Sequence, residues 1–344
     1  MATCIGRLTV AAALALLAGV ANAAPEVTLK LHHFLSPKAP AHAAMLAPWA
    51  ERVEKASNGR IKIDIYPSMT LGGKPPQLIR QVRDGVVDII WAVNGYAAGS
   101  HPRTEVFELP FVHTNNAVAT NMAMYDTFDE YLADDYKDVK VLALHVHAGQ
   151  AIHMVDSPVR TASDLEGKKM RIPTRTGAWI LEALGATPVG MPVPELPQAL
   201  SKKVVDGALI PFEIIRPLKI HELTKYQIEG VDNTRFGTTT FQISMNPDSW
   251  NRLPDDLKKV MDEQTGAAWW REIGEIWTRT ETGGLKAAVD AGNEHILIGK
   301  SELAKFEKRL QPVVDRWIAE VEAKGIDGRA LVAAARAAIA RHSK

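Results

Sequence analysis

The sequence predicts an α/β protein made of two domains, and three observations support this. The chain has 344 residues, and roughly 150 residues are typical of one domain. Strand and helix patterns alternate twice along the chain, with a break at Gly149 between the two series. After Pro254 the pattern changes to long helices. A composition of 46% hydrophobic and 23% charged residues agrees with an ordinary globular protein.

The charge balance argues against a nucleic-acid partner. Lysine and arginine number 40, and aspartate and glutamate also number 40. Binding to phosphate backbones needs a clustered excess of basic residues, which the sequence lacks. We therefore expect no nucleic acid among the partners.

Residues 1–23 have the pattern of a signal peptide. Arg7 precedes an apolar run over 8–20, and the run is followed by the small-x-small tripeptide that ends at Ala23. The run is too short for a membrane span, which needs about 20 apolar residues. The single cysteine, Cys4, precedes the run, whereas a lipoprotein cysteine would follow it. We expect cleavage after Ala23, export to the periplasm, no membrane insertion and a mature chain without cysteine.

The first series of elements covers the residues up to 148. Asn58 and Gly59 are a helix stop signal, and residues 60–66 then alternate as a strand. Residues 86–91 are almost continuously apolar, which is typical of a strand buried on both faces of a parallel sheet. The predicted strands are 27–34, 60–66, 86–91 and 142–147, and the predicted helices are 41–56 and 75–84.

The second series starts after Gly149 and ends in helices. Its short units predict strands at 169–173, 187–191 and 205–209 and helices at 177–184 and 195–201. Residues 255–282 contain two glycines and begin with acidic residues, which predicts one continuous helix. At about 1.5 Å per residue, such a helix is long enough to join two domains. Residues 287–344 are predicted to form further helices.

The usual signatures of enzymes and cofactor sites are absent from the sequence. There is no G-x-S-x-G, P-loop, G-x-G-x-x-G or C-x-x-C motif. His145 and His147 share one face of a strand, but no third metal ligand lies near them in the sequence, and a structural pair is the favoured interpretation. His32 and His33 point to opposite faces of a strand, so one of them is expected to face a cleft. We therefore predict no catalytic residue, metal or cofactor.

A series of short motifs carries a resemblance to a known family. The segment 167–174 (GKKMRIPT) follows 162–165 (ASDL) and precedes 184–189 (LGATPV). Together these segments closely resemble the substrate-binding proteins of TRAP (tripartite ATP-independent periplasmic) transporters, of the dicarboxylate-receptor-like type. The resemblance extends from about Val27 to the C-terminal helices. Further motifs in the family's order are 58–60 (NGR), 71–73 (LGG), 83–89 (RDGVVDI), 107–111 (FELPF) and 205–208 (VDGA).

The resemblance implies a fold and a function. The fold would be the two-lobed periplasmic binding protein fold, with a ligand cleft between the lobes and a long helix that spans both. Lobe I would hold residues 24–148 and about 236–276, and lobe II residues 149–235 and about 277–344. The protein would be a transport receptor that binds a small organic acid and delivers it to the TRAP membrane permease subunits.

In this family the arginine of the G-x-K-x-R-x-P segment forms a salt bridge with the ligand carboxylate, and that residue is Arg171 here. A planar guanidinium matches the two oxygens of a carboxylate and fixes its orientation as well as its charge. Two alternatives come from the residues themselves. Arg171 could pair with a structural acid such as Asp164. Arg175 could add a second cation and make the ligand a dicarboxylate, although its position in a loop favours surface exposure.

Two departures from the family pattern remove polar ligand contacts. Many members carry a second arginine in a G-x-R pattern, where this chain has Gly149, Gln150 and Ala151. The family's frequent V-D-G-x-E-N-P also changes, so that Ile210 replaces an amide. One cation and a largely apolar lining favour a monocarboxylate with an aromatic or apolar remainder.

Several aromatic residues at strand ends complete the predicted site. Each of them could be a core residue, but together they favour a pocket that buries apolar surface. His33, Asn94 and Gln150 could still serve a hydroxyl or keto group of the ligand. The candidate ligand-binding residues are Arg171, His33, Phe34, Trp91, Tyr96, Gln150, His153, Ile210 and Phe212.

Other functions remain open at this point. A periplasmic enzyme could act on a small carboxylate with His33 or His153 as general base beside Arg171. A ligand sensor would use the same fold and the same binding physics. The ligand could also be a sugar acid or a dicarboxylate, and the sequence leaves the oligomeric state open.

Overall fold

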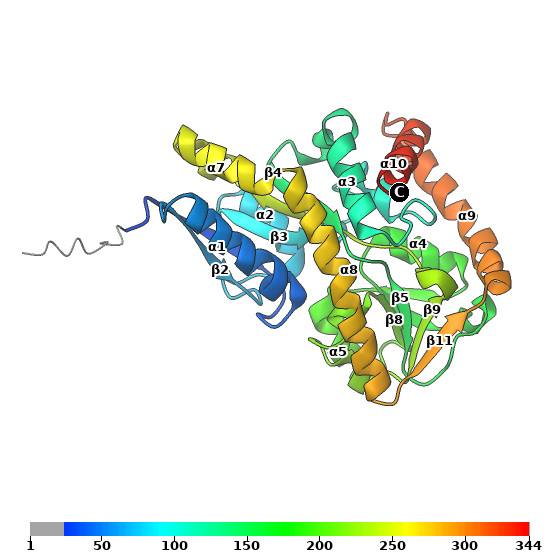
Figure 1. Cartoon of the computed structure of the whole chain (residues 1–344). Coiled ribbons are helices and arrows are strands. Elements are labelled where there is room, and N and C mark those ends of the chain that lie inside the picture. The colour runs from blue at the N-terminus through cyan, green and yellow to red at the C-terminus, as the bar shows by residue number, and fades with distance from the viewer. Residues whose placement is uncertain (1–23, 344) are drawn as a thin grey trace, which may run out of the picture.

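A computed structural model describes residues 24–343, so the predicted signal peptide over 1–23 lies outside the described residues. The chain forms two separate sheets (Figure 1). The first sheet has the order β2-β1-β3-β10-β4. Strand β1 pairs in parallel with β2 and β3, while β10 runs antiparallel to β3 and β4. Its strands are β1 (Val27–His33), β2 (Ile61–Tyr66), β3 (Ile89–Val93), β4 (Lys140–Val146) and β10 (Thr240–Met245).

The second sheet has the order β11-β9-β5-β8-β6-β7. Strand β6 is parallel to β7 and β8, and β5 is antiparallel to β8 and β9. Three of its strands, β5, β9 and β11, were not predicted, because each is short and follows a segment without clear periodicity. Its strands are β5 (Ala151–Met154), β6 (Lys169–Ile172), β7 (Thr187–Gly190), β8 (Gly207–Ile210), β9 (Tyr226–Gly230) and β11 (Glu294–Ile298). The prediction of helices over 287–344 is wrong at β11, which pairs in parallel with β9.

Two segments lie side by side where the chain passes between the sheets. The N–H of Gln150 donates to the carbonyl of Gly237, and the N–H of Phe236 donates to the carbonyl of Gln150, both at 2.8 Å. Gly149 has a φ of +116°, and a Cβ atom there would lie 2.6 Å from the Cβ of Arg235. A glycine is therefore required for this close passage. We keep the division of the chain into two lobes at these segments as a proposal.

The prediction of one continuous helix over 255–282 is wrong, because two helices occupy this region. They are α7 (Asp255–Thr265) and α8 (Ala267–Asp290). Gly266 between them has a ψ of −173°, an extended conformation that ends α7 and starts α8. Helix α8 packs against β4 of the first sheet and continues to the region of the second sheet (Figure 1). The predicted connecting role therefore belongs to α8.

The remaining helices cover the sheets. Helix α10 packs against α3, and its Arg341 and His342 contact Asp126 at 3.2 and 2.8 Å. The last helix is thus attached to α3, although the sequence placed it with the second lobe. No described helix is long and apolar enough to span a membrane. These helices are α1 (Ala47–Ala56), α2 (Leu78–Arg83), α3 (Ala117–Thr127), α4 (Arg175–Ala183), α5 (Leu196–Ser201), α6 (Pro247–Asn251), α9 (Lys300–Glu322) and α10 (Gly328–His342).

Candidate functional site

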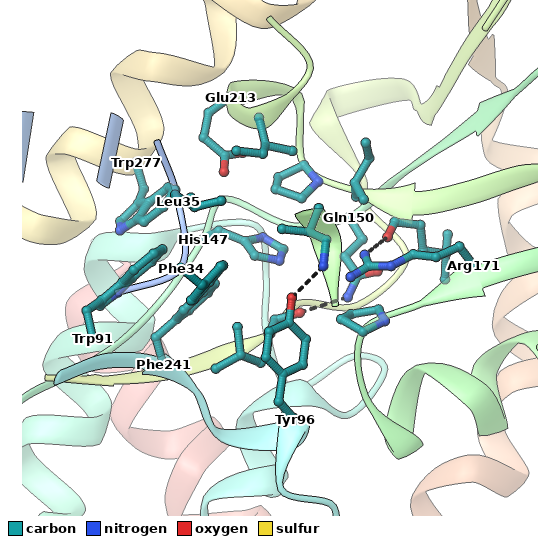
Figure 2. A pocket seen from close by; sticks show the side chains of 18 residues that line it. Phe34, Leu35, Trp91, Tyr96, His147, Gln150, Arg171, Glu213, Phe241 and Trp277 are labelled. Atoms are coloured by element: carbon teal, nitrogen blue, oxygen red, sulfur yellow. Dashed lines mark hydrogen bonds between the residues drawn. The ribbon is translucent and has the colours of Figure 1, made fainter. Parts of the chain in front are cut away.

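A cavity with an empty volume of about 420 Å³, part of it open to solvent, lies where strand ends of both sheets meet. Figure 2 shows aromatic rings on one side of it and Arg171 on another. Six of the nine predicted site residues line it: Arg171, Phe34, Trp91, Tyr96, Gln150 and Ile210. The other lining residues are Leu35, Val93, His147, Pro173, Val193, Leu209, Pro211, Glu213, Ile214, Thr239, Phe241 and Trp277.

Arg171 lies on β6 and is only 2% exposed. Its Nε and Nη2 donate to the carbonyl oxygen of Met191 at 3.0 and 2.8 Å, and Nη1 donates to the carbonyl oxygen of Leu209 at 3.4 Å. A guanidinium has five N–H groups, so these three bonds leave one N–H on each terminal nitrogen. Two such groups side by side suit the two oxygens of a carboxylate.

No described aspartate or glutamate forms an ion pair with Arg171. Its predicted alternative partner, Asp164, instead accepts hydrogen bonds from the backbone N–H groups of Arg160 and Thr161, both at 2.8 Å. Burial lowers the pKa of Arg171, while the nearby Tyr96 hydroxyl and the more distant Glu195 oppose this shift. The guanidinium stays protonated, because its pKa starts above 12. A buried cation without a counter-ion is costly, and an anionic ligand would relieve that cost.

The Tyr96 hydroxyl lies beside this guanidinium. Its oxygen accepts a hydrogen bond from the N–H of Val193 at 2.8 Å, so its own proton remains available to a ligand. Burial raises the pKa of Tyr96, which keeps the hydroxyl protonated at neutral pH. Tyr96 therefore offers a second donor at the arginine end of the cavity.

A stack of aromatic rings forms the apolar wall. The Phe34 and Trp91 rings are parallel within 9° with centroids 4.7 Å apart, and Trp91 stacks on Phe241 at 5.2 Å. The indole N–H of Trp91 donates to Nε2 of His145 at 2.8 Å, which satisfies its polar group away from the cavity. This wall offers flat aromatic surface, against which a ligand ring can stack.

His147, which the sequence analysis treated only as part of a pair, also lines the cavity. Its Nδ1 accepts a hydrogen bond from the N–H of Gly149 at 3.0 Å, so in the neutral ring the proton is on Nε2. Burial lowers the pKa of His147 well below its usual value, and the ring is therefore neutral. Gln150 beside it donates to Thr239 at 3.1 Å and leaves its Oε1 without a partner.

Three predicted site residues do not line this cavity. His33 hydrogen-bonds to His42 at 2.9 Å, and burial lowers its pKa to about 3. Both ring nitrogens of His153 are bonded within the protein. The Phe212 ring packs under the guanidinium of Arg235 at 4.7 Å. Since the two histidines are held behind the cavity wall, neither is placed to act as the general base beside Arg171.

Arg175 and Asn94 also have protein partners. Arg175 forms ion pairs with Glu105 and Glu320, so it is not a second cation in the cavity. The amide group of Asn94 is bonded to Tyr136 and Thr240. Among the described residues that line the cavity, Arg171 is the only lysine or arginine. The described part of the chain contains no group of three or more potential metal ligands.

Comparisons with known proteins agree with this architecture. The DctP family, bacterial extracellular solute-binding protein family 7, matches residues 31–320. A TRAP solute-binding protein from an unidentified marine microbe, specific for aromatic acid ligands and crystallised with metahydroxyphenylacetate, is 43% identical with a TM-score of 0.90 and covers 92% of this chain and 100% of its own. A TRAP solute-binding protein from Rhodoferax ferrireducens with copurified benzoate is 42% identical, with a TM-score of 0.90. The match covers 92% of this chain and 98% of the other chain.

A curated relative has a different ligand. The C4-dicarboxylate-binding periplasmic protein DctP of Rhodobacter capsulatus is 28% identical over 94% of this chain and 96% of its own. The predicted two-lobed α/β binding-protein fold is confirmed by the similarity to the solved structures. The chain belongs to bacterial extracellular solute-binding protein family 7 and is a TRAP solute-binding protein.

Proposed function

We propose that this protein is a periplasmic receptor that binds an aromatic monocarboxylate through Arg171 and delivers it to a TRAP membrane permease. The observation that carries the proposal is a buried guanidinium without a described acidic partner, in a cavity with a stacked aromatic wall. A ligand carboxylate would accept from the free N–H groups of Arg171 and from the Tyr96 hydroxyl. The ligand ring would lie against Phe34 and the neighbouring aromatic side chains.

The lining argues against other acids. A second carboxylate would find no second lysine or arginine among the described lining residues. A sugar acid would bury several hydroxyls beside aliphatic side chains such as Ile210, at a cost of about 1–3 kcal/mol for each unpaired group. The two structural neighbours at 42–43% identity were found with aromatic acids, which supports the same class here.

The test is the affinity of the mature protein for benzoate and 3-hydroxybenzoate, measured by calorimetric titration. Arg171→Ala leaves the ligand anion buried and unpaired, which costs about 2–5 kcal/mol. We expect the affinity to fall between roughly 30-fold and several thousand-fold. Arg171→Lys should recover only part of the loss, because an ammonium cannot offer two parallel donors.

The matched control is Arg309→Ala. Arg309 is a surface arginine on α9 that pairs with Glu166 and lies outside the cavity. The Arg309→Ala variant should bind benzoate and 3-hydroxybenzoate with the affinity of the wild type. Unchanged affinity in Arg171→Ala would overturn the proposed role of Arg171, and preferential binding of a dicarboxylate or sugar acid would overturn the ligand class. Delivery is tested by uptake of labelled benzoate in cells that carry the permease with wild-type or Arg171→Ala receptor.

A further inference from the structure

The proposed function leaves a buried carboxyl group of the cavity without a role. Glu213 lines the cavity, is only 6% exposed, and has no partner for its Oε2. It follows β8 in the short 3₁₀ helix Phe212–Ile214. Figure 2 shows it entering the cavity from a different side than Arg171.

Helix α8 fixes the position of Glu213. A Cβ atom at Gly284 would lie 1.7 Å from the carbonyl oxygen of Phe212, so only a glycine allows the backbone to pack this closely on α8. One turn earlier, Glu281 accepts a hydrogen bond from the N–H of Glu213 at 3.1 Å. The backbone that carries Glu213 is therefore held rigidly, as a specificity-determining residue requires.

The charges around Glu213 keep its carboxyl group neutral. The nearby cation, Arg235, forms ion pairs with Glu281 at 2.6 Å and with Glu229 at 2.8 Å. Glu213 therefore has a carboxylate for a neighbour and receives no counter-ion. Burial, followed by the repulsion from Glu281 and a side-chain hydrogen bond with it, raises the pKa of Glu213 well above its usual value. The proton of the neutral acid is shared with Glu281, and Oε2, which has no partner, is free to accept a hydrogen bond from a phenolic hydroxyl.

We propose that Glu213 selects ligands that carry a hydroxyl group on the aromatic ring, by hydrogen-bonding to that hydroxyl while Arg171 holds the carboxylate. This inference rests on the proposed function and narrows its ligand class to hydroxy-substituted aromatic monocarboxylates. A ligand with a hydrogen atom in place of the hydroxyl leaves Oε2 of Glu213 buried without a partner, as it is now. A site built to bond a substrate hydroxyl discriminates against analogues that lack it.

The experiment measures the ratio of the affinities for 3-hydroxybenzoate and benzoate by calorimetric titration. In the wild type we expect the hydroxylated acid to bind roughly tenfold tighter or better. Glu213→Leu should bring the ratio close to one, because leucine fills the space without a polar group. Glu213→Gln should keep most of the preference, because a neutral amide also donates and accepts. Glu222→Leu is the matched control, since Glu222 lies outside the cavity with its side chain 54% exposed.

Each outcome bears on one proposal. A wild-type ratio below about twofold, or an unchanged ratio in Glu213→Leu, overturns this inference and leaves the aromatic-acid receptor in place. The wild-type ratio decides even if Glu213→Leu does not fold. Failure to bind either acid, with binding of a dicarboxylate or sugar acid instead, overturns the proposed function itself.

Discussion

Two arginines with buried side chains, Arg171 and Arg235, have opposite surroundings. The side chain of Arg235 is 7% exposed and contacts the carboxylates of Glu229 and Glu281, and its guanidinium stacks over Phe212. Arg171 is 2% exposed, and its described partners are neutral: the backbone carbonyls of Met191 and Leu209 and the Tyr96 hydroxyl. The protein thus supplies the counter-ions of Arg235 and leaves that of Arg171 open.

The difference distinguishes an arginine that stabilises the fold from one that is available to bind a ligand. A buried ion network holds its elements together only while every member is present, and here it joins β9 to α8 beside the crossing segments. A buried cation with neutral partners has a free energy cost that a bound anion reduces. The same residue type therefore serves stability at one position and, as we propose, affinity at the other.

The largest expected effect comes from Arg235→Met. It leaves Glu229 and Glu281 buried without their cation, which costs about 3–5 kcal/mol in the free energy of unfolding. Arg171→Met in the unliganded protein should leave that free energy unchanged or raise it, because it removes a cation that lacks a counter-ion. Urea unfolding of both variants without ligand measures the contrast. Equal losses in the two variants would show that Arg171 has a structural role as well, and the comparison would fail.

Buried histidines differ from both arginines, because they are uncharged in the folded protein. Burial lowers the pKa of His145 to about 3 and that of His113 to about 4. Below pH 6.5 the unfolded chain binds protons that these folded rings do not. Each such histidine lowers the free energy of unfolding by up to about 1.4 kcal/mol per pH unit on acidification. Burial also lowers the pKa of His33 to about 3 and those of His101 and His153 to about 4.

Buried carboxyl groups with a raised pKa act in the opposite direction. Burial raises the pKa of Glu108 to about 7 and that of Asp135 to about 6, so their contribution to stability grows as the pH falls through these values. Burial also raises the pKa of Glu213 and Glu281, and it lowers the pKa of His32, His42 and His147. Eight histidines therefore oppose four carboxyl groups, and we expect the urea midpoint to be lower at pH 5 than at pH 7. A midpoint that is equal or higher at pH 5 would contradict the assignment of neutral buried histidines.

The sequence was sufficient for the parts of the site that depend on local pattern. Arg171 lies in a recognisable motif on a strand, Phe34 and Trp91 end predicted strands, and Tyr96 follows the second of these strands. The role of Glu213 depends on Gly284 and Glu281 about 70 residues away, a contact that no local pattern indicates. His33 was placed in the site because it ends a strand, but its ring is hydrogen-bonded to His42 in the helical segment Ala41–Leu46.

Prediction of the fold was also limited to features with a local sequence pattern. The series of strands and helices followed from periodicity, whereas the break at Gly266 did not, because a single glycine inside a long helical pattern is usually tolerated. Arg175 is the most instructive case. Its position four residues after Arg171 suggested a ligand contact or a surface site, and its acidic partners come from the distant residues 105 and 320.

The smallest expected effect concerns Arg175→Ala. Arg175 is on α4, which packs on the second sheet, and Glu105 is in the 3₁₀ helix Thr104–Glu108, which packs beside β10 of the first sheet. The ion pair therefore connects the surroundings of both sheets outside the cavity. Arg175→Ala leaves the Glu105 carboxylate, which is 5% exposed, without its cation. The Arg175 side chain is itself 22% exposed, so water reaches the site and replaces part of the lost contact. We expect a loss of about 1–2 kcal/mol in the free energy of unfolding, less than in Arg235→Met.

The affinity of Arg175→Ala for 3-hydroxybenzoate should fall by no more than about fivefold, since any effect acts only through the relative position of the two sheets. Arg316→Ala is the matched control. Arg316 lies over the Trp179 ring at 4.5 Å, as Arg175 does at 4.8 Å. It pairs with Glu182 and approaches Glu320, and no described ion pair joins it to Glu105. Urea unfolding and calorimetric titration of both variants separate the two effects. A loss of affinity in Arg175→Ala as large as in Arg171→Ala would mean that Arg175 contacts the ligand as a second cation, and the monocarboxylate class would then give way to a dicarboxylate.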